Sequence, residues 1–353
     1  MKIISNYSKD TKTQKKVSGS YEWWYFDAQS ADGYKFVVIF YEGNPFSRRY
    51  IQAQENGFFN EADQYPAISI SVYKDDQPIY YSFREVDAQS AVFSMDVPSG
   101  TIENNRFEGR SKQTHLEYTL DLDQTLPTGD SIKANLTFTA DLYSKPYFPA
   151  SDSDSSAHEW NLVMPSGHVH GTIQISGYHE EEIQFKGLGY HDHNLGFEPM
   201  KENFTEWYWG RYHMENSTFV YYLLSKKGKW EKKAWLINKR GDVKICDKIE
   251  LSNYGVSLFG LKTAREILTQ AGESEIYLQL DETLDSGPFY QRFGGRLLIN
   301  TGDRVEESRG ISEYIKPARI YDKVFWPLVN MRIAYPGKQH WVQKNPVLYR
   351  WTW

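Results

Sequence analysis

Short segments in which apolar and polar residues alternate are the feature that most limits how this chain can fold. Apolar residues occupy every second position beside the turns KDDQP and PTGD, at Ile68, Ile70, Val72, Leu116, Tyr118, Leu120, Leu122, Leu136, Phe138 and Ala140. Such alternation between turn signals is typical of half-buried strands joined as hairpins. Aromatic residues, which suit the pleated surface of strands, make up 16% of the chain. The sequence therefore predicts an all-β protein built from antiparallel barrels or sandwiches.

A weak internal repeat divides the chain into two parts. The segment YEWWYFDAQSADGYKFVVIFYEG, which begins at Tyr21, is echoed by TEWYWGRYHMENSTFVYYLLSKKG, which begins at Thr205. In each copy a Glu-Trp pair opens an aromatic strand, a polar turn follows, and an apolar strand closes the unit. A chain of 353 residues has room for about two domains. We therefore expect two related β-domains, residues 1–199 and 200–353, with one helical segment at Leu261–Gly272.

Charge and composition exclude several partners and compartments. The net charge is −6, with Lys and Arg scattered among Asp and Glu, so the chain lacks the basic field that nucleic-acid binding requires. The start of the chain has no signal-peptide apolar core, and no window approaches 18 consecutive apolar residues, which predicts an unexported, cytoplasmic protein. Cys246 is the one cysteine, so no intrachain disulfide can form. We expect its side chain to be buried and to pack as a small hydrophobic group. The sequence gives no indication of oligomeric state.

Two His-x-His pairs suggest one kind of site. His168 with His170, and His191 with His193, each place two imidazoles on one face of an expected strand. Zinc, iron and copper sites use such geometry. The alternative is that these histidines only bond backbone groups or line a polar surface, and the pattern alone leaves both possibilities open.

Asp192 suggests a different kind of site. Strand alternation places Tyr190, Asp192 and Asn194 on the face opposite His191 and His193. An aspartate held among aromatic rings is desolvated, which keeps it protonated and able to act as a general acid. The acidic segment SDSDSSAHEWN is expected to be a surface loop that leads into a strand. Within it His158 and Trp160 share one strand face, where they supply a proton partner and a ring face for a developing cation.

The pattern of apolar residues before these positions conflicts with the acid hypothesis. Ile183 and Phe185 place the apolar face on odd-numbered residues, so a regular strand would turn His191 and His193 inward and Asp192 outward. Glycines within a strand often mark a bulge, and one extra residue exchanges the two faces. The acid hypothesis therefore requires a bulge between Gly187 and Gly189, whereas the metal hypothesis does not.

Several familiar motifs are missing from the sequence. The chain contains no Gly-rich phosphate loop, no Gly-x-Ser-x-Gly elbow and no His-Glu-x-x-His pair. The sequence therefore contains no motif that would indicate a nucleotide-binding protein, a serine hydrolase or a zincin.

The remaining motifs resemble a known family. EWWYFD near the start, HEWNL in the middle, and GLGYHDHNLGFEP followed by WYWGRYH resemble the carotenoid 1,2-hydratases, also called hydroxyneurosporene synthases, and their attachment-protein-like relatives. The resemblance covers most of the chain to about Tyr212, and GISEYIKP from Gly310 extends it more weakly. The Gly-x-Gly-Tyr-x-Asp-His-Asn core is its most specific part.

The resemblance implies two lipocalin-like β-domains that act on hydrophobic polyene or isoprenoid substrates and require no metal or nucleotide. The His-x-Trp and Tyr-x-Asp pairs implicated in the hydratases fall here on His158 with Trp160 and on Tyr190 with Asp192. The aspartate is thought to protonate a terminal carbon–carbon double bond, giving a cation that water captures. Other relatives act as cyclases, including Diels–Alder-type enzymes.

We therefore expect a lyase or cyclase without cofactor or metal, acting on an isoprenoid, polyene or polyketide-like substrate. Asp192 is the expected proton donor, with Tyr190, His158 and Trp160 as catalytic partners. Residues expected to bind the substrate are Trp23, Trp24 and Asn194. Transient membrane contact would serve uptake of so hydrophobic a substrate. The alternatives are a non-catalytic lipocalin-like carrier of a hydrophobic ligand and a metal enzyme built on the two histidine pairs.

Overall fold

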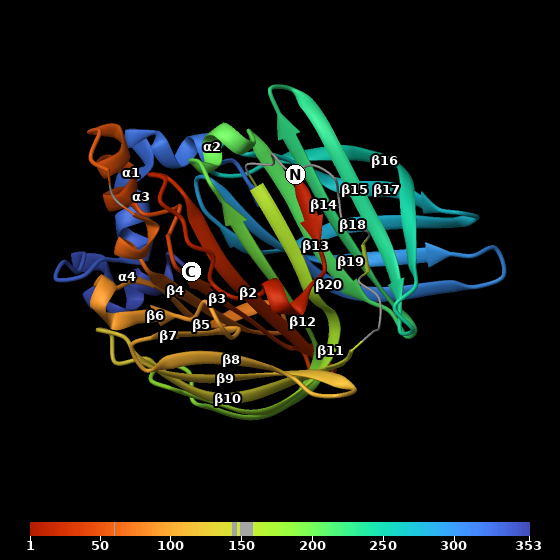
Figure 1. Cartoon of the computed structure of the whole chain (residues 1–353), viewed down its shortest axis with the longest axis horizontal. Coiled ribbons are helices and arrows are strands. Elements are labelled where there is room, and N and C mark those ends of the chain that lie inside the picture. The colour runs from red at the N-terminus through yellow and green to blue at the C-terminus, as the bar shows by residue number, and fades with distance from the viewer. Residues whose placement is uncertain (60, 143–146, 149–157) are drawn as a thin grey trace. The chain divides into compact units, whose positions relative to one another are not determined.

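The computed structural model describes residues 1–59, 61–142, 147–148 and 158–353. These residues form two compact units: Met1–Met200 with Trp326–Trp353, and Lys201–Phe325. Strands dominate both units (Figure 1), so the predicted all-β class is confirmed. The expected acidic loop lies, up to residue 157, outside the described residues.

The first unit is a curled sheet of 13 described strands. They are β1 Lys2–Ile4, β2 Tyr21–Ser30, β3 Tyr34–Tyr41, β4 Ala67–Lys74, β5 Gln77–Glu85, β6 Ala91–Phe93, β7 Ser99–Ile102, β8 Asn105–Ser111, β9 His115–Thr125, β10 Ser131–Asp141, β11 His158–Ser176, β12 Glu181–Gly196 and β21 Ile333–Ala334. The order across the sheet is β21, β5, β4, β3, β2, β12, β11, β10, β9, β8, β7 and β6, and β1 pairs with β11. The contacts β1–β11 and β21–β5 are parallel, and the other strand pairs of this sheet are antiparallel.

The second unit is a closed antiparallel barrel in which each strand pairs with the next. Its strands are β13 Glu206–His213, β14 Ser217–Lys226, β15 Lys229–Asn238, β16 Val243–Val256, β17 Lys262–Ala271, β18 Ser274–Ser286, β19 Tyr290–Asn300 and β20 Val305–Ile315. β20 returns to β13 and closes the barrel, which leaves no free sheet edge. Aromatic and aliphatic side chains fill the interior, among them Tyr208, Tyr212, Phe219, Leu278 and Phe293.

The helices are short and lie in the connections between strands and in the C-terminal segment. The α-helices are α1 Arg48–Glu55, α2 Met200–Asn203, α3 Trp326–Arg332 and α4 Pro346–Arg350. The 3-10 turns are Tyr7–Lys9, Ala62–Gln64, Ala88–Ser90, Pro317–Tyr321, Lys323–Phe325 and Trp341–Lys344. Within the described residues, no helix has both the length and the apolar character needed to cross a membrane.

Both hairpins predicted from the alternating pattern are confirmed. β4 and β5 are joined through Asp75 and Asp76, whose φ angles of 48° and 64° are those of a type I′ turn. β9 and β10 pair over their whole length on either side of the PTGD turn. In β9 the buried residues fall on every second position, which is the pattern read from the sequence.

The repeated segments also form equivalent hairpins. The first copy is the pair β2–β3, in which Trp23 faces Tyr41, and the second is β13–β14, in which Trp207 faces Leu224. Each hairpin supplies neighbouring strands of its own sheet. The order of aromatic strand, turn and apolar strand is therefore confirmed in both copies.

The predicted helix at Leu261–Gly272 is wrong, because this segment forms β17. Thr263, Ile267 and Thr269 are buried at odd-numbered positions, a period that suits a strand. β17 pairs with β16 on one side and β18 on the other. These long-range pairings override the helical propensity of the local sequence.

The C-terminal segment belongs to the first unit. β21 pairs with the edge strand β5, Tyr349 is 3% exposed, and Arg350 donates hydrogen bonds to the Asp130 carboxylate at 3.0 and 3.2 Å. The sequence-based division places residues 326–353 in the second domain, whereas these contacts attach them to the first. Covering the edge of β5 gives a physical reason for this return of the chain.

This attachment predicts that Tyr349→Ala lowers the melting temperature by roughly 10 °C, because removing a buried aromatic side chain costs about 3–5 kcal/mol. Trp351→Ala is the matched control, since Trp351 lies just beyond the same helix and is 82% exposed. Differential scanning calorimetry compares the two variants. Equal melting temperatures would contradict the docking of this segment.

Candidate functional site

Strand β12 lies between β2 and β11, and its second half is buried on both faces. Every residue from Gly189 to Gly196 is buried, as is every residue of β2 from Tyr21 to Ala28. Both faces of this half of β12 are therefore turned away from solvent. Asp192 and the two histidines are buried on opposite sides of one strand.

The predicted bulge between Gly187 and Gly189 is wrong. β12 pairs with β2 in unbroken register from Gly187 to Gly196. The irregularities lie in the partner strand β11, between Leu162 and Gly167. Because β12 is regular, its histidines face the same side as Phe185, as strict alternation requires. Asp192 is nevertheless buried, because the opposite face of β12 is covered as well.

The Asp192 carboxyl group receives three hydrogen bonds from side chains. The Trp160 indole N–H donates to Oδ2 at 2.8 Å, and the Tyr190 hydroxyl donates to the same oxygen at 2.6 Å. The Asn194 amide donates to Oδ1 at 2.9 Å. Trp160 lies on β11 and the other two residues lie on β12, so strand pairing and alternation bring the donors together. Four of the predicted site residues thus form one cluster.

Two opposing influences act on this carboxyl group. Asp192 is 3% exposed, and burial in a low-dielectric environment favours a neutral acid. The three donors favour a carboxylate. A group held between these influences can lose a proton and keep its geometry, because the donors are already in place.

His158 lies on the same face, two residues before Trp160. Its Nδ1 is 3.0 Å from the Tyr21 hydroxyl. Burial, together with the nearby N-terminal ammonium group, lowers the pKa of His158 to about 3. His158 is therefore a neutral imidazole at neutral pH, able to donate or accept a hydrogen bond but not to act as a cation.

Aromatic rings from β2 surround this face. Trp23 pairs with Asn194 and stacks on Tyr21, with ring centroids 5.3 Å apart. Trp23 also lies 6.4 Å from the His158 ring. The ring of Tyr25 meets that of Tyr190 edge-on at 6.2 Å. The predicted Trp23 therefore belongs to this group of residues.

Besides Tyr21, the partner of His158, the sequence did not point to two further residues of this face. Tyr25 pairs with Asp192 across the sheet, and Asp27, which is fully buried, pairs with Tyr190. Both lie in the EWWYFD motif at the same parity as Trp23. Strand alternation places both residues on the same face as Trp23. The sequence could not show which face this is, because both faces of β2 carry buried residues.

Trp24 lies on the other face of β2, away from Asp192. Its ring stacks on that of His193 at 4.6 Å, and its indole N–H donates to the backbone carbonyl of Asp10 at 2.9 Å. Strand alternation separates Trp23 from Trp24, so adjacent tryptophans serve different surfaces. The structure does not bring Trp24 together with the other predicted substrate-binding residues.

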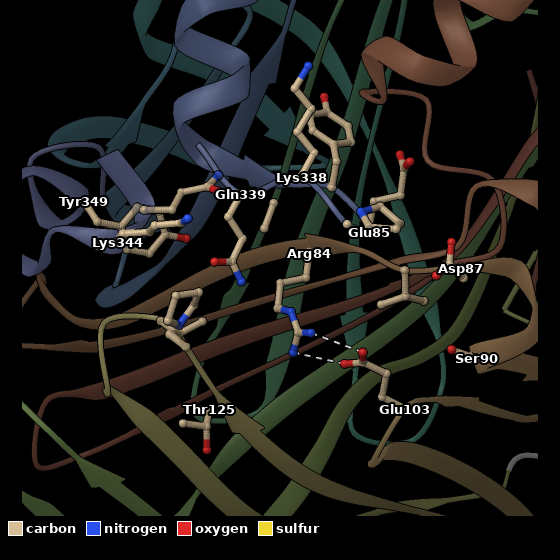
Figure 2. A pocket seen from close by; sticks show the side chains of 18 residues that line it. Arg84, Glu85, Asp87, Ser90, Glu103, Thr125, Lys338, Gln339, Lys344 and Tyr349 are labelled. Atoms are coloured by element: carbon tan, nitrogen blue, oxygen red, sulfur yellow. Dashed lines mark hydrogen bonds and ion pairs between the residues drawn. The ribbon is translucent and has the colours of Figure 1, made fainter. Parts of the chain in front are cut away.

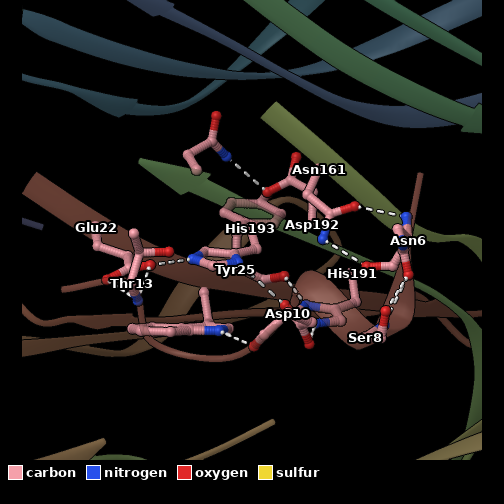
Figure 3. Close-up of polar contacts among 12 residues, drawn as sticks. Asn6, Ser8, Asp10, Thr13, Glu22, Tyr25, Asn161, His191, Asp192 and His193 are labelled. Atoms are coloured by element: carbon pink, nitrogen blue, oxygen red, sulfur yellow. Dashed lines mark hydrogen bonds and ion pairs between the residues drawn. The ribbon is translucent and has the colours of Figure 1, made fainter. Parts of the chain in front are cut away.

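His191 is held by the N-terminal segment (Figure 3). Its Nε2 lies 2.9 Å from the Asp10 carboxylate, and its Nδ1 lies 2.9 Å from the Tyr25 carbonyl oxygen. Asp10 also accepts a hydrogen bond from the Tyr118 hydroxyl. The ring of His191 stacks on Phe26, with centroids 3.9 Å apart and planes 1° from parallel. This histidine is a packed structural residue with both nitrogens facing oxygen atoms.

His193 belongs to a buried set of charges. Its Nε2 lies 2.8 Å from Glu22, which also pairs with Lys15, and Lys15 pairs in turn with Glu42. Burial opposes the charged forms, but Lys15 and His193 outweigh it and lower the pKa of Glu22 to about 2. Burial likewise opposes protonation of His193, yet Glu22 and Asp10 raise the pKa of His193 above its ordinary value. The histidine face of β12 is thus held by buried charged groups that stabilise one another.

The two His-x-His pairs do not meet. His168 and His170 are exposed on β11, whereas His191 and His193 are buried. Across the described part of the chain, no group of three or more His, Cys, Asp and Glu side chains has an arrangement that could hold a metal ion. The metal hypothesis built one site from both pairs, and the structure separates them.

A cavity of about 620 Å³ lies elsewhere in the first unit (Figure 2). Its walls carry polar groups, including the ion pair between Arg84 and Glu103 at 3.0 Å. Glu85 also lines it, and burial, opposed by Arg49, raises the pKa of Glu85 to about 7. Walls so rich in charge do not suit an apolar polyene, so we place the candidate site at Asp192.

The fold and the site define a lipocalin-like β-protein with an aspartate buried among aromatic hydrogen-bond donors. The family model for the carotenoid hydratase CrtC matches residues 63–344, and the chain belongs to this family. The family resemblance inferred from the motifs is confirmed. Membership identifies the chain as a lyase-type enzyme, so the alternative of a non-catalytic carrier is set aside.

Individual relatives agree with membership of this family. A protein of Chlorobaculum tepidum named hydroxyneurosporene dehydrogenase is 31% identical over 343 residues, covering 91% of this chain and 89% of the relative. An acyclic carotenoid 1,2-hydratase of Thiocapsa roseopersicina is 23% identical, covering 85% of this chain and 70% of the relative. The crystal structure of CghA matches with a TM-score of 0.61 at 12% identity, covering 87% of this chain and 93% of CghA. The last match supports the fold.

The buried ions predict that Glu22→Gln destabilises the protein strongly. Removing one partner of a buried ion pair typically costs about 3–5 kcal/mol, which lowers the melting temperature by roughly 10 °C. Thermal unfolding at neutral pH measures the change. Glu117→Gln is the control, because Glu117 forms a surface ion pair with Lys112. Equal melting temperatures for the two variants would contradict the account.

The same variant gives a predicted pH dependence. Because the pKa of Glu22 is depressed to about 2, its stabilisation is complete above the unfolded-state pKa near 4.3 and is lost as the pH falls toward 2. The difference in melting temperature between wild type and Glu22→Gln should therefore shrink across that acidic range. A difference that stays constant there would show that Glu22 is not charged in the folded protein.

Proposed function

We propose that the protein adds water to a carbon–carbon double bond of a hydrophobic polyene or isoprenoid, with Asp192 as the proton donor. The observation that carries the proposal is the buried Asp192 carboxyl group held by three donors beside aromatic rings. Family membership and the naming of relatives as acyclic carotenoid 1,2-hydratases support the substrate class. Cyclisation of the same cation is the second outcome that this chemistry allows.

We assign the transferable proton to Oδ1. Trp160 and Tyr190 both hold Oδ2 by hydrogen bonds, and the Asn194 amide donates to Oδ1. A protonated Oδ1 keeps a lone pair for this amide, so all three donors can stay in place while its O–H points at a substrate. A substrate double bond beside Oδ1 would then face an acid whose other oxygen is fixed.

The proposed reaction begins with transfer of this proton to one carbon of the double bond. The π electrons form the new carbon–hydrogen bond and leave a tertiary cation on the other carbon. Asp192 becomes a carboxylate that its three donors stabilise, which makes it a stronger acid toward a weakly basic alkene. Water then adds to the cation, and loss of its proton to the carboxylate restores Asp192 and leaves an alcohol.

The surrounding residues have roles that match their chemistry. The ring faces of Trp160 and Trp23 can stabilise the cationic intermediate by cation–π interaction, worth about 0.5–2 kcal/mol for each ring. Neutral His158, bonded to Tyr21, can orient the attacking water without adding positive charge near the cation. Tyr190 holds the carboxyl group from the same strand.

Asp192→Asn is expected to lower kcat by about 10²- to 10⁴-fold, because the amide cannot donate the proton. The assay incubates the protein with an acyclic carotenoid in detergent and measures the product by liquid chromatography and mass spectrometry. Asp123→Asn, at an exposed acid of β9, should keep the wild-type rate. Wild-type turnover by folded Asp192→Asn would rule out the proposed acid.

The product mass separates the possible reactions. Hydration adds one water to the substrate, whereas cyclisation leaves its mass unchanged. Loss of two hydrogens would indicate dehydrogenation, the activity named for the Chlorobaculum tepidum relative, and would contradict the proposal. Recovery of unchanged substrate would also contradict the proposed hydration.

Trp160→Phe tests the donor role of the indole separately from its ring. The variant keeps an aromatic face but loses the hydrogen bond to Asp192, so kcat should fall by about 10- to 100-fold. The same carotenoid assay measures it, with the melting temperature checked to confirm folding. An unchanged kcat would show that the indole N–H does not assist the acid.

A further inference from the structure

One end of the second-unit barrel displays apolar and cationic side chains together. Consecutive strands of this barrel run antiparallel, so the β14–β15 turn and the β16–β17 turn lie at the same end. Tyr208 on β13 contacts a strand beside each turn: its ring lies 6.0 Å from that of Trp230 on β15, and its hydroxyl accepts a hydrogen bond from the Ala264 N–H on β17 at 2.9 Å. We call residues 226–230 and 254–262 the rim.

The rim exposes apolar side chains that a soluble barrel would be expected to bury. Tyr254 is 48% exposed, Val256 is 69% exposed and Leu258, at the turn, is 94% exposed. Trp230 on the neighbouring turn is 37% exposed. Large exposed apolar groups gathered at one place mark contact sites more often than chance exposure does.

The turn that carries Leu258 is held in a fixed conformation. The Ser257 N–H donates to the Leu261 carbonyl at 2.9 Å, and the Gly260 N–H donates to the Ser257 carbonyl at 2.8 Å. Arg319 donates to the carbonyl oxygens of Phe259 and Gly260 from outside the turn. Because the backbone of this turn is already fixed, little conformational entropy is lost when Leu258 binds to another surface.

The charge of the rim is positive in a chain whose net charge is −6. The stretch from Leu251 to Arg265 contains no acidic residue and two cations, Lys262 and Arg265. Lys262 lies 5.1 Å from the centre of the Tyr254 ring. The other turn, in the sequence SKKGKW, adds three exposed lysines, at 226, 227 and 229. Trp and Tyr beside lysine are the residues that settle at the interface between lipid headgroups and acyl chains.

We propose that this rim docks the protein on the surface of a bilayer that contains anionic lipid. Leu258 and Val256 enter the boundary between headgroups and acyl chains, Trp230 and Tyr254 lie at the headgroup level, and the lysines face the anionic headgroups. A nucleic acid would use the cations but not the exposed aliphatic groups. The docking surface is independent of the chemistry proposed for Asp192.

The test is flotation of the full-length protein with vesicles of phosphatidylcholine containing about 30% phosphatidylglycerol, compared with phosphatidylcholine alone. Wild type should float with the anionic vesicles and dissociate when the salt is raised from about 0.1 M to 0.5 M. The double variant Val256→Ser with Leu258→Ser should reduce the partition coefficient at least tenfold, since a buried aliphatic side chain contributes about one to two orders of magnitude.

A second variant and a matched control complete the test. Lys227→Glu with Lys229→Glu should weaken binding to anionic vesicles by roughly fivefold or more for each cation lost. Ile245→Ser is the control, because Ile245 is 74% exposed on the same strand β16 but lies toward its opposite end. Failure of wild type to float, or equal loss of binding in Ile245→Ser and the rim variants, would overturn the proposal.

Discussion

The burial of polar side chains on both faces of β12 is the constraint on which the candidate site depends. A buried charge or hydrogen-bonding group is costly unless it has a partner, and Asp192, His191 and His193 each find theirs on a different element. Asp192 uses donors on β11 and β12, His191 uses Asp10, and His193 uses Glu22. Displacing the strand along its length would take the two histidines from Asp10 and Glu22, and Asp192 from the Trp160 indole.

This arrangement separates support from chemistry within one strand. The ions on the histidine side hold β12 against β2 and the N-terminal segment, while the carboxyl group on the other side keeps its donors in place. Preorganised donors are effective in catalysis because they need not reorient as charge develops. The same division explains why His191 and His193, which resemble metal ligands in the sequence, are occupied by structural contacts.

The sequence predicted what depends on local pattern. Alternation gave the hairpins at KDDQP and PTGD and the common face of Tyr190, Asp192 and Asn194. Prediction from the local pattern failed where packing against other strands determines the structure. β17 lies between two strands, so its helical pattern had no effect, and Trp24 lies in a stretch buried on both faces. Asp10 and Lys15 could not be predicted as partners, since only the fold brings a polar N-terminal segment beside residues 191 and 193.

The central claim is that substrate meets the acid at Asp192. The most direct test is a crystal structure of the protein with an unreactive acyclic carotenoid analogue in which the terminal double bond is saturated. The account predicts that the saturated carbons lie about 3–4 Å from Oδ1 of Asp192, with the rings of Trp160 and Trp23 beside them. An analogue bound elsewhere, for example in the polar cavity beside Arg84 and Glu85, would contradict it.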